Sequence, residues 1–213
     1  LVIALLIAFT KMPKASDTDK KISFLPTVKR LFSHPNYAWG VLAQFFYVGA
    51  QIGVWSFTIR YVMTELGINE DGAANYYLAA LILFTVFRFV STYLMRFIAA
   101  HRLLGILSIL AITLSGVVIF GGGITAVIAL VSISACMSLM YPTIYGLSVR
   151  GLGADTKMGS SFLVMAILGG AVLTALQGKV SDMTNSIHYA YFVPLLCFAF
   201  ISYYALGRKH AYA

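Results

Sequence analysis

Apolar residues gather in six long stretches along the chain, and short polar joints separate them. The stretches cover residues 37–64, 73–99, 103–120, 124–149, 159–178 and 188–207. A helix needs roughly 20 apolar residues to cross the hydrocarbon core of a bilayer, and each stretch is close to that length or longer. The pattern therefore predicts an all-α membrane protein with six transmembrane helices.

The first 35 residues follow a different pattern. Residues 1–10 are apolar, but as a helix they rise only about 15 Å, half of a hydrocarbon core of about 30 Å. We expect them to be the tail of a preceding transmembrane helix, in a chain that is a fragment of a longer protein. Residues 11–35 combine charges with three prolines and predict a cytoplasmic linker, with a short amphipathic helix over 24–32. Residues 36–208 then form the six-helix bundle and residues 209–213 a cytoplasmic tail.

The basic residues set the orientation of these helices. The linker holds six of them, Arg96 and Arg102 stand at the end of the second stretch and in the joint after it, and the joints after the fourth and sixth stretches hold two each, so twelve of the 15 Lys and Arg residues fall on one side. An excess of Lys and Arg marks cytoplasmic loops. The linker and both ends of the bundle are therefore predicted to be cytoplasmic, and Glu65, Glu70 and Asp71 lie outside.

Composition narrows the classes of function. The chain is 60% apolar and 10% charged, with a mean hydropathy of +0.88, which is typical of a membrane protein. The net charge of +8 is explained by the cytoplasmic joints, so no nucleic-acid partner is expected. Two cysteines in apolar runs and four scattered histidines form no disulfide framework or metal cluster. No nucleophile with a base stands at depth, so we expect neither an enzyme nor a cofactor.

Polar residues in the first stretch share one side of the predicted helix. At 100° per residue, Gln44, Tyr47, Gln51, Trp55 and Thr58 fall within about 80°. Amides and a phenol supply donors and acceptors, and aromatic faces supply an apolar platform. A sugar, with hydroxyls at its edge and an apolar C–H face, suits that combination. A bridging role between helices is the alternative for each single polar residue.

The fourth stretch carries a second polar stripe at helical spacing. Its members are Ser134, Ser138, Tyr141, Tyr145 and Ser148. Pro142 in the same stretch removes a backbone donor and predicts a bend, through packing or for function. We expect Gln44, Gln51 and Tyr141 to face a common water-accessible cavity.

Arg88 lies deep in the second stretch, where an arginine is costly without a polar partner. No acid lies at matching depth, so we expect polar partners in the protein interior or a contact with substrate. Arg60 is expected to reach the outer headgroups. His101 and His188, at the membrane edges, are expected to be solvated. Ala166, Gly170 and Thr174 have a spacing that favours close packing of a neighbouring helix. The candidate substrate-binding residues are Gln44, Tyr47, Gln51, Trp55, Arg88 and Tyr141.

Several stretches resemble one transporter family. They are "FFYVGAQIGVWSF", "RFVSTYLMRFIAAHRLL", "MYPTIYGLSVRGLGADTKMGSSFLVMAILGGAV" and "GKVSD", and they are similar to the fucose, galactose and glucose proton symporters of the major facilitator superfamily. The resemblance implies the C-terminal six-helix half of a twelve-helix, L-fucose permease-like carrier in a bacterial inner membrane.

By the same resemblance, the sugar cavity lies between two six-helix halves, and the acids that couple transport to protons belong to the N-terminal half. The partners would then be a sugar, protons, the lipid bilayer and that N-terminal half. Two alternatives stay open: another major facilitator carrier of a small polar solute, and a channel or receptor-like membrane bundle.

Overall fold

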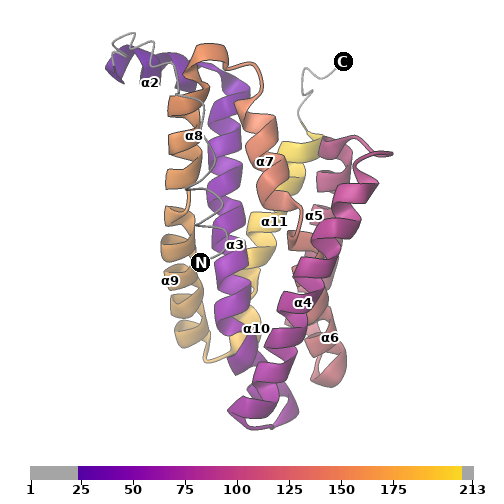
Figure 1. Cartoon of the computed structure of the whole chain (residues 1–213). Helices are drawn as coiled ribbons and strands as arrows, with labels where there is room; N and C mark the ends of the chain where they lie inside the picture. The colour runs from indigo at the N-terminus through magenta and orange to yellow at the C-terminus, as the bar shows by residue number, and fades with distance from the viewer. Residues whose placement is uncertain (1–23, 208–213) are drawn as a thin grey trace, which may run out of the picture.

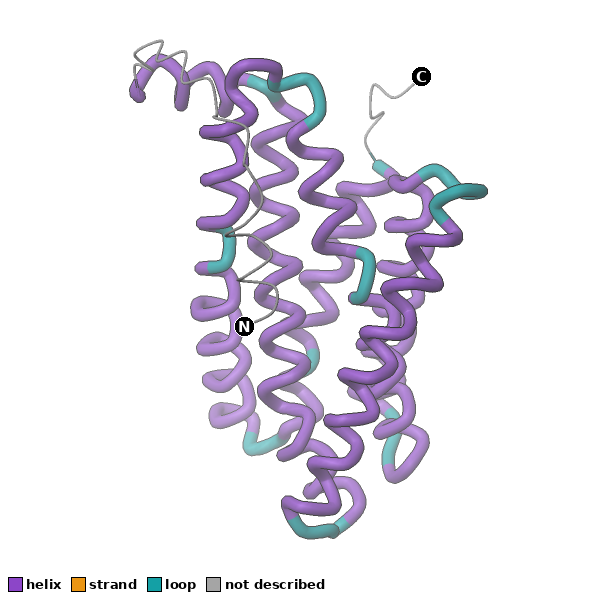
Figure 2. The backbone as a smooth tube through the Cα atoms, in the orientation of Figure 1, coloured by secondary structure: helices purple, strands orange, loops and turns teal. Residues whose placement is uncertain are grey.

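The computed structural model describes residues 24–207, which fold into helices joined by short turns (Figures 1 and 2). Residues 1–10, most of the linker and residues 209–213 lie outside the described part of the chain. In chain order the elements are α2 Phe24–Ser33, α3 Pro35–Leu66, α4 Glu70–Leu94, α5 Ala100–Phe120, α6 Gly123–Met137, α7 Met140–Val149, the 3₁₀ turn η1 Gly153–Asp155, α8 Thr156–Met165, α9 Leu168–Thr184, α10 Ile187–Ala190 and α11 Phe192–Leu206.

Six helical segments are long and apolar enough to cross a membrane. They are α3, α4, α5, the pair α6 and α7, the run from η1 to α9, and the pair α10 and α11. The prediction of six spans is confirmed. The boundaries differ in the second span, because α4 ends at Leu94 and a turn of backbone hydrogen bonds covers residues 95–98. The short helix predicted over 24–32 is present as α2, which projects sideways from one end of the bundle, next to the start of α8 (Figure 1).

The first joint between spans shows why the helices end where they do. Gly67 closes α3 in the left-handed conformation, with φ of 61°, and donates its N–H to the Met63 carbonyl at 3.0 Å. Asn69 then caps α4, because its side-chain oxygen accepts the N–H of Gly72 at 3.0 Å. Glu70 and Asp71 place negative charge in the first turn of α4, where the helix dipole favours it.

Two spans are broken in the middle. The bend predicted from Pro142 is observed as a break at Ser138 and Leu139, between α6 and α7. Proline at position 142 cannot bond the carbonyl four residues back, which is that of Ser138, and its ring crowds that carbonyl. A second break, at Ala166 and Ile167, separates α8 from α9.

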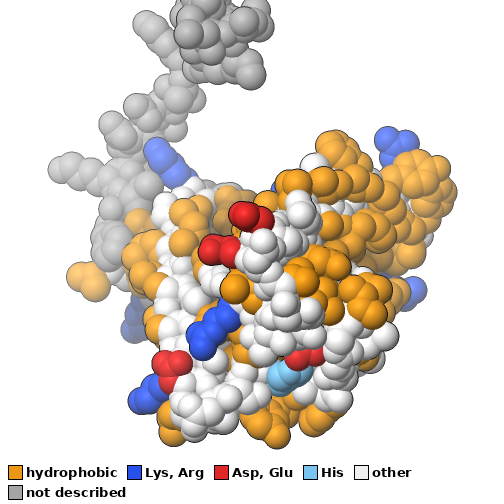
Figure 3. All heavy atoms as spheres, turned by 90° about the horizontal axis from the view of Figure 1, so that it is seen from below, with side chains coloured by type: hydrophobic (Ala, Val, Ile, Leu, Met, Phe, Trp, Pro, Cys, Tyr) orange, Lys and Arg blue, Asp and Glu red, His pale blue; other side chains and the backbone are white. Residues whose placement is uncertain are grey.

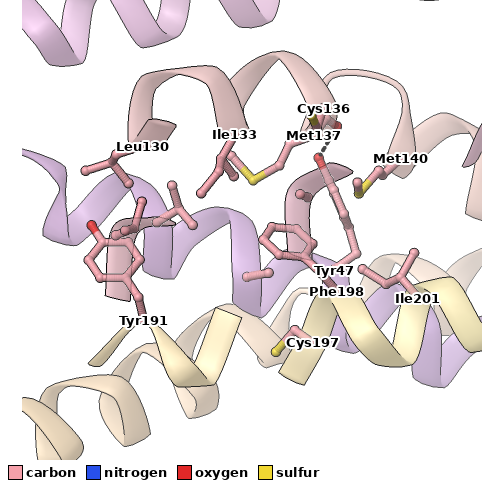
Figure 4. Packing of buried hydrophobic residues seen from close by; sticks show 14 of the residues in the cluster. Tyr47, Leu130, Ile133, Cys136, Met137, Met140, Tyr191, Cys197, Phe198 and Ile201 are labelled. Carbon is pink, nitrogen blue, oxygen red and sulfur yellow. Dashed lines mark hydrogen bonds between the residues drawn. The ribbon is translucent and has the colours of Figure 1, made fainter. Parts of the chain in front are cut away.

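The hydrophobic core lies where α3 meets α6 and α11, and Figure 4 shows part of it. Tyr47, Ile133, Met137, Phe198 and Ile201 are fully buried there. Along its length α3 packs against α9, α11, α7 and α4. It is therefore the central helix of the bundle, and it positions the polar stripe singled out in the sequence.

The outer half of the fifth span packs tightly on α3. A Cβ atom at Gly169 would overlap the Phe45 carbonyl oxygen, so the two helix backbones are in contact there. Gly49 of α3 faces the Leu173 side chain and the Gly169 carbonyl oxygen of α9. The predicted small-residue packing is present, and Ala166 and Gly170 are buried, but the closest approach is made by Gly169.

Candidate functional site

Tyr47 joins the first polar stripe to the broken fourth span. Its side chain is fully buried, and its hydroxyl donates to the Met137 carbonyl at 3.0 Å, the dashed line in Figure 4. Its ring meets Tyr141 edge to face, with 6.0 Å between the ring centroids. The hydrogen bond and the ring contact hold Tyr47 in one orientation, beside the break between α6 and α7.

Trp55 lies two turns further along α3 and is half-buried. Its indole N–H donates to the Ser134 hydroxyl at 3.3 Å, and its ring meets Phe84 of α4 at 5.1 Å between centroids. Three spans therefore meet at one indole. A fixed aromatic face of this kind can stack against the apolar side of a ligand.

Gln44 and Gln51 differ in their surroundings. Gln51 is half-buried. Gln44 is fully buried and forms no hydrogen bond within the described residues. The expectation that Gln44 faces water is therefore wrong for this structure. The reason lies one turn earlier, at Gly40, which brings α3 against Ser148 of α7 and Tyr204 of α11, and this close packing encloses the next turn of α3.

The second stripe is divided by the break in its span. Tyr141 and Tyr145 of α7 are half-buried, whereas Ser134, Ser138 and Ser148 are buried. Ser138 donates to the Ala135 carbonyl at 2.7 Å, and Ser148 donates to the Ile144 carbonyl at 2.6 Å. Both hydroxyl groups thus donate to backbone carbonyls of their own span. The member of the stripe that contacts Tyr47 is Tyr141.

Arg88 is exposed on α4, a helix in which only Ala73, Ala80 and Ser91 are buried. It forms no ion pair within residues 24–207. The expected interior partners are thus not supplied by the described residues. The structure thus brings Tyr47 and Tyr141 together, whereas Gln44 is enclosed and Arg88 is exposed on α4.

A polar cluster at the opposite end was not anticipated from the sequence. His188 pairs through Nε2 with Glu65 at 2.7 Å, and the other carboxylate oxygen of Glu65 accepts the N–H of Gly123 at 2.6 Å. Tyr61 donates to the Val118 carbonyl at 2.7 Å, beside the His188 ring. The His188 side chain is 25% exposed, and the sequence did not predict the carboxylate that the fold brings to it from α3. This end of the molecule shows charged side chains and a histidine among polar atoms (Figure 3).

Another buried amide escaped the sequence reading. Gln177 of α9 lies against Gly53 of α3, is fully buried, and has no hydrogen-bond partner within the described residues. The available signal was its position on the same face as Gly170 and Leu173, at intervals of three and four residues. In residues 24–207 no group of three His, Cys, Asp or Glu side chains has an arrangement that would hold a metal ion.

Comparison with known proteins finds relatives along nearly the whole chain. No protein-family model matches the chain. Over 98% of its length the chain is 42% identical to the L-fucose-proton symporter of Escherichia coli K12, and it covers 49% of that protein. It is 36% identical to the L-fucose-proton symporter of Haemophilus influenzae and 35% identical to a putative glucose/galactose transporter of Helicobacter pylori, covering 49% and 51% of those proteins.

A solved structure of a transporter also matches the chain over nearly its whole length. The chain matches the crystal structure of a major facilitator superfamily transporter, FucP, in the outward conformation, with a TM-score of 0.90 and 42% sequence identity. The match covers 98% of this chain and 51% of that one. The chain therefore spans about half the length of the relatives it matches.

Proposed function

We propose that the chain, which belongs to the fucose, glucose and galactose proton symporter family of the major facilitator superfamily, is the C-terminal half of a monosaccharide carrier. The protein is a multi-span membrane protein of a transporter family and not an enzyme. The proposed substrate is L-fucose or a related hexose. Transport is coupled to protons and proceeds by alternating access together with an N-terminal six-helix half.

The observation that carries the proposal is that Gln51 and Trp55 of α3 and Tyr141 of α7 are all only half-buried. Trp55 offers an aromatic plane held by Ser134 and Phe84. Gln51 and Tyr141 are half-buried, so their polar groups remain available to hydroxyl groups of a ligand. A fixed platform with a few polar groups beside it is the usual composition of a small-molecule site.

This face is one wall of a site. A hexose held by one wall keeps hydroxyl groups in water or without partners, and little of its desolvation cost is recovered. Tyr47 then acts from behind the wall, because its hydrogen bond to Met137 fixes α3 against the break in the fourth span. The second wall belongs to the N-terminal half.

Proton coupling is also assigned to that half. A proton carrier needs an acid at depth whose charge changes during the cycle. Within residues 24–207, each carboxylate stands at or near the end of a span: Glu65, Glu70, Asp71, Asp155 and Asp182. None of them can serve as a mid-membrane proton site, so this half would contribute sugar contacts and the moving wall.

Counterflow of labelled sugar into vesicles that contain the full-length protein tests the proposal. We expect exchange of at least one of L-fucose, D-galactose and D-glucose, and net uptake that grows with an inward proton gradient. Trp55→Phe and Gln51→Leu should each raise the KM about tenfold, equivalent to about 1.4 kcal/mol. Trp39→Phe is the matched control, because Trp39 stacks on Phe200 of α11, away from the stripe.

The outcomes separate substrate from site. Unchanged KM values in both stripe variants would remove the site assignment while leaving the family intact. Absence of exchange with every hexose would instead point to another small polar solute. An equal rise in KM in Trp39→Phe would show that the effect is a general loss of packing.

A further inference from the structure

A groove of about 470 Å³ opens between α2, α3 and the junction of α8 and α9. Every side chain that lines it is apolar. Its volume is within the range of about 300–1,000 Å³ that is typical of small-molecule sites. A sugar would find no hydrogen-bonding groups there. The walls include Phe32, Val41, Leu42, Phe45, Phe162 and Met165.

Two exposed lysines flank the Arg30–Asp155 ion pair, which joins α2 to the start of α8. Lys29 is one helical turn before Phe32 on α2, and Lys157 is five residues before Phe162 on α8. The rings of Phe32 and Phe162 meet edge to face at 5.7 Å between centroids, so both helices contribute to the same rim. Within the described residues neither lysine forms an ion pair.

The wall formed by α2 is held in place. Arg30 donates two hydrogen bonds to the Asp155 carboxylate, at 2.6 and 2.5 Å. Leu31 is fully buried next to Leu163 of α8, whereas Leu25 is 80% exposed. An anchored helix that exposes both apolar and basic side chains is typical of a segment that lies in a membrane interface.

We propose that this groove binds an anionic phospholipid of the cytoplasmic leaflet. One acyl chain occupies the apolar groove, and the headgroup phosphate lies between Lys29 and Lys157. The cytoplasmic leaflet is rich in anionic lipid, which attracts basic residues at the membrane surface, and the charge bias of the chain places α2 on that side. The site is separate from the proposed sugar face and does not depend on it.

The size of the groove favours an acyl chain over a protein helix. A helix with its side chains is about 10 Å across, and a cylinder of that width fills 470 Å³ within about one turn. A lipid chain is narrower and can follow the groove along α3 from the level of Ala38 to that of Phe45.

Native mass spectrometry of the full-length protein in detergent tests this site. The protein is titrated with palmitoyl-oleoyl phosphatidylglycerol, with phosphatidylcholine of the same chains, and with inorganic phosphate. We expect phosphatidylglycerol to bind at least tenfold more tightly than phosphatidylcholine. Lys29→Gln combined with Lys157→Gln should weaken the binding of phosphatidylglycerol by about fivefold per lysine. The affinity for phosphatidylcholine should not change. Lys179→Gln, an exposed lysine near the far end of α9, is the matched control and should change neither lipid.

The groove itself is tested by filling it. Ala38→Phe, or Leu42→Trp if the first variant does not fold, should weaken the binding of both lipids to the same extent. Equal affinity for the two lipids in the unmodified protein, or an equal loss in Lys179→Gln, would overturn the proposal. Competition by inorganic phosphate would point to a free-phosphate site instead. Failure of both lipids to bind would also overturn the proposal. Sugar exchange by the same preparation is an independent measurement, so either proposal can fail alone.

Discussion

The fifth span contains two halves that meet α3 in opposite ways. In α9, Gly169 lies against the Phe45 carbonyl, and Gly49 of α3 lies against Leu173, so the two helices touch backbone to backbone. In α8 an apolar groove separates much of the helix from α3. There the contacts are made by side chains, such as the Tyr37 hydroxyl that donates to the Gly159 carbonyl at 2.8 Å.

The difference shows how one span can combine a fixed half with an adjustable one. Two backbones in contact cannot give way without moving a whole helix, because main-chain atoms have no rotamers to change. Side-chain ends can rotate between staggered states at small cost. The break at Ala166 and Ile167 lies where one kind of contact changes into the other.

The largest effect is expected from Gly169→Ala. The added methyl group overlaps the Phe45 carbonyl oxygen, which cannot move alone, so we expect a loss of about 3 kcal/mol in the free energy of unfolding. Thermal unfolding of the full-length protein in detergent measures it. Gly116→Ala is the matched control, because a Cβ there meets no atom within 4 Å, and it should be neutral or slightly stabilising. Equal melting temperatures for the two variants would mean that backbone contact is not what holds α9.

A smaller effect is expected from Tyr37→Phe, which acts on the α8 half. The substitution removes the hydroxyl group that donates to the Gly159 carbonyl. The buried carbonyl then loses this hydrogen bond, so the free energy of unfolding should fall by about 1–2 kcal/mol. Tyr145→Phe is the control: Tyr145 packs against the same cluster of Leu31, Leu152 and Leu163, and its hydroxyl makes no hydrogen bond within the described residues. A loss in Tyr145→Phe as large as that in Tyr37→Phe would assign the effect to packing instead of the hydrogen bond.

The smallest effect on stability is expected from Asp155→Asn, because the pair with Arg30 is exposed to solvent. Its effect should appear as mobility of α8. A cysteine at Leu163, in an otherwise cysteine-free protein, should react faster with maleimide after Asp155→Asn, whereas a cysteine at Leu173 in α9 should not. Exchanging the two charges, Arg30→Asp with Asp155→Arg, should restore slow labelling. Faster labelling at both positions would erase the distinction between the halves.

The sequence was sufficient for the six spans, because each must be apolar over a length that the bilayer sets. The stripe on α3 could also be predicted in part. Helical phase is reliable along an unbroken helix, and Tyr47 and Trp55 do turn toward the fourth span. The prediction from helical spacing was wrong beyond Ser138, because the break in the helix changes the direction in which the following side chains point. Ser148 is buried in the core as a result.

Contacts between distant parts of the chain had no local signal. Gln44 is enclosed because Gly40 admits α7 and α11 one turn away, which depends on the packing of three helices. Glu65 meets His188 only because the spans bring α3 and α10 together. The apolar groove, too, results from how α8 diverges from α3 and not from any motif. Pattern alone identifies which residues are polar, and tertiary structure decides which of them stay available.

The Glu65 and His188 cluster fastens the helix ends at one rim of the bundle. Through side chains and backbone it ties the end of α3 to the ends of α5 and α10 and to the start of α6. A helix of 32 residues is a lever about 48 Å long. If α3 and α9 tilted together by roughly 5° about that end, the far tip of α3 would move by about 4 Å. A small rotation at one end of the molecule would therefore displace the other end of α3, next to α2 and α8, by several ångströms.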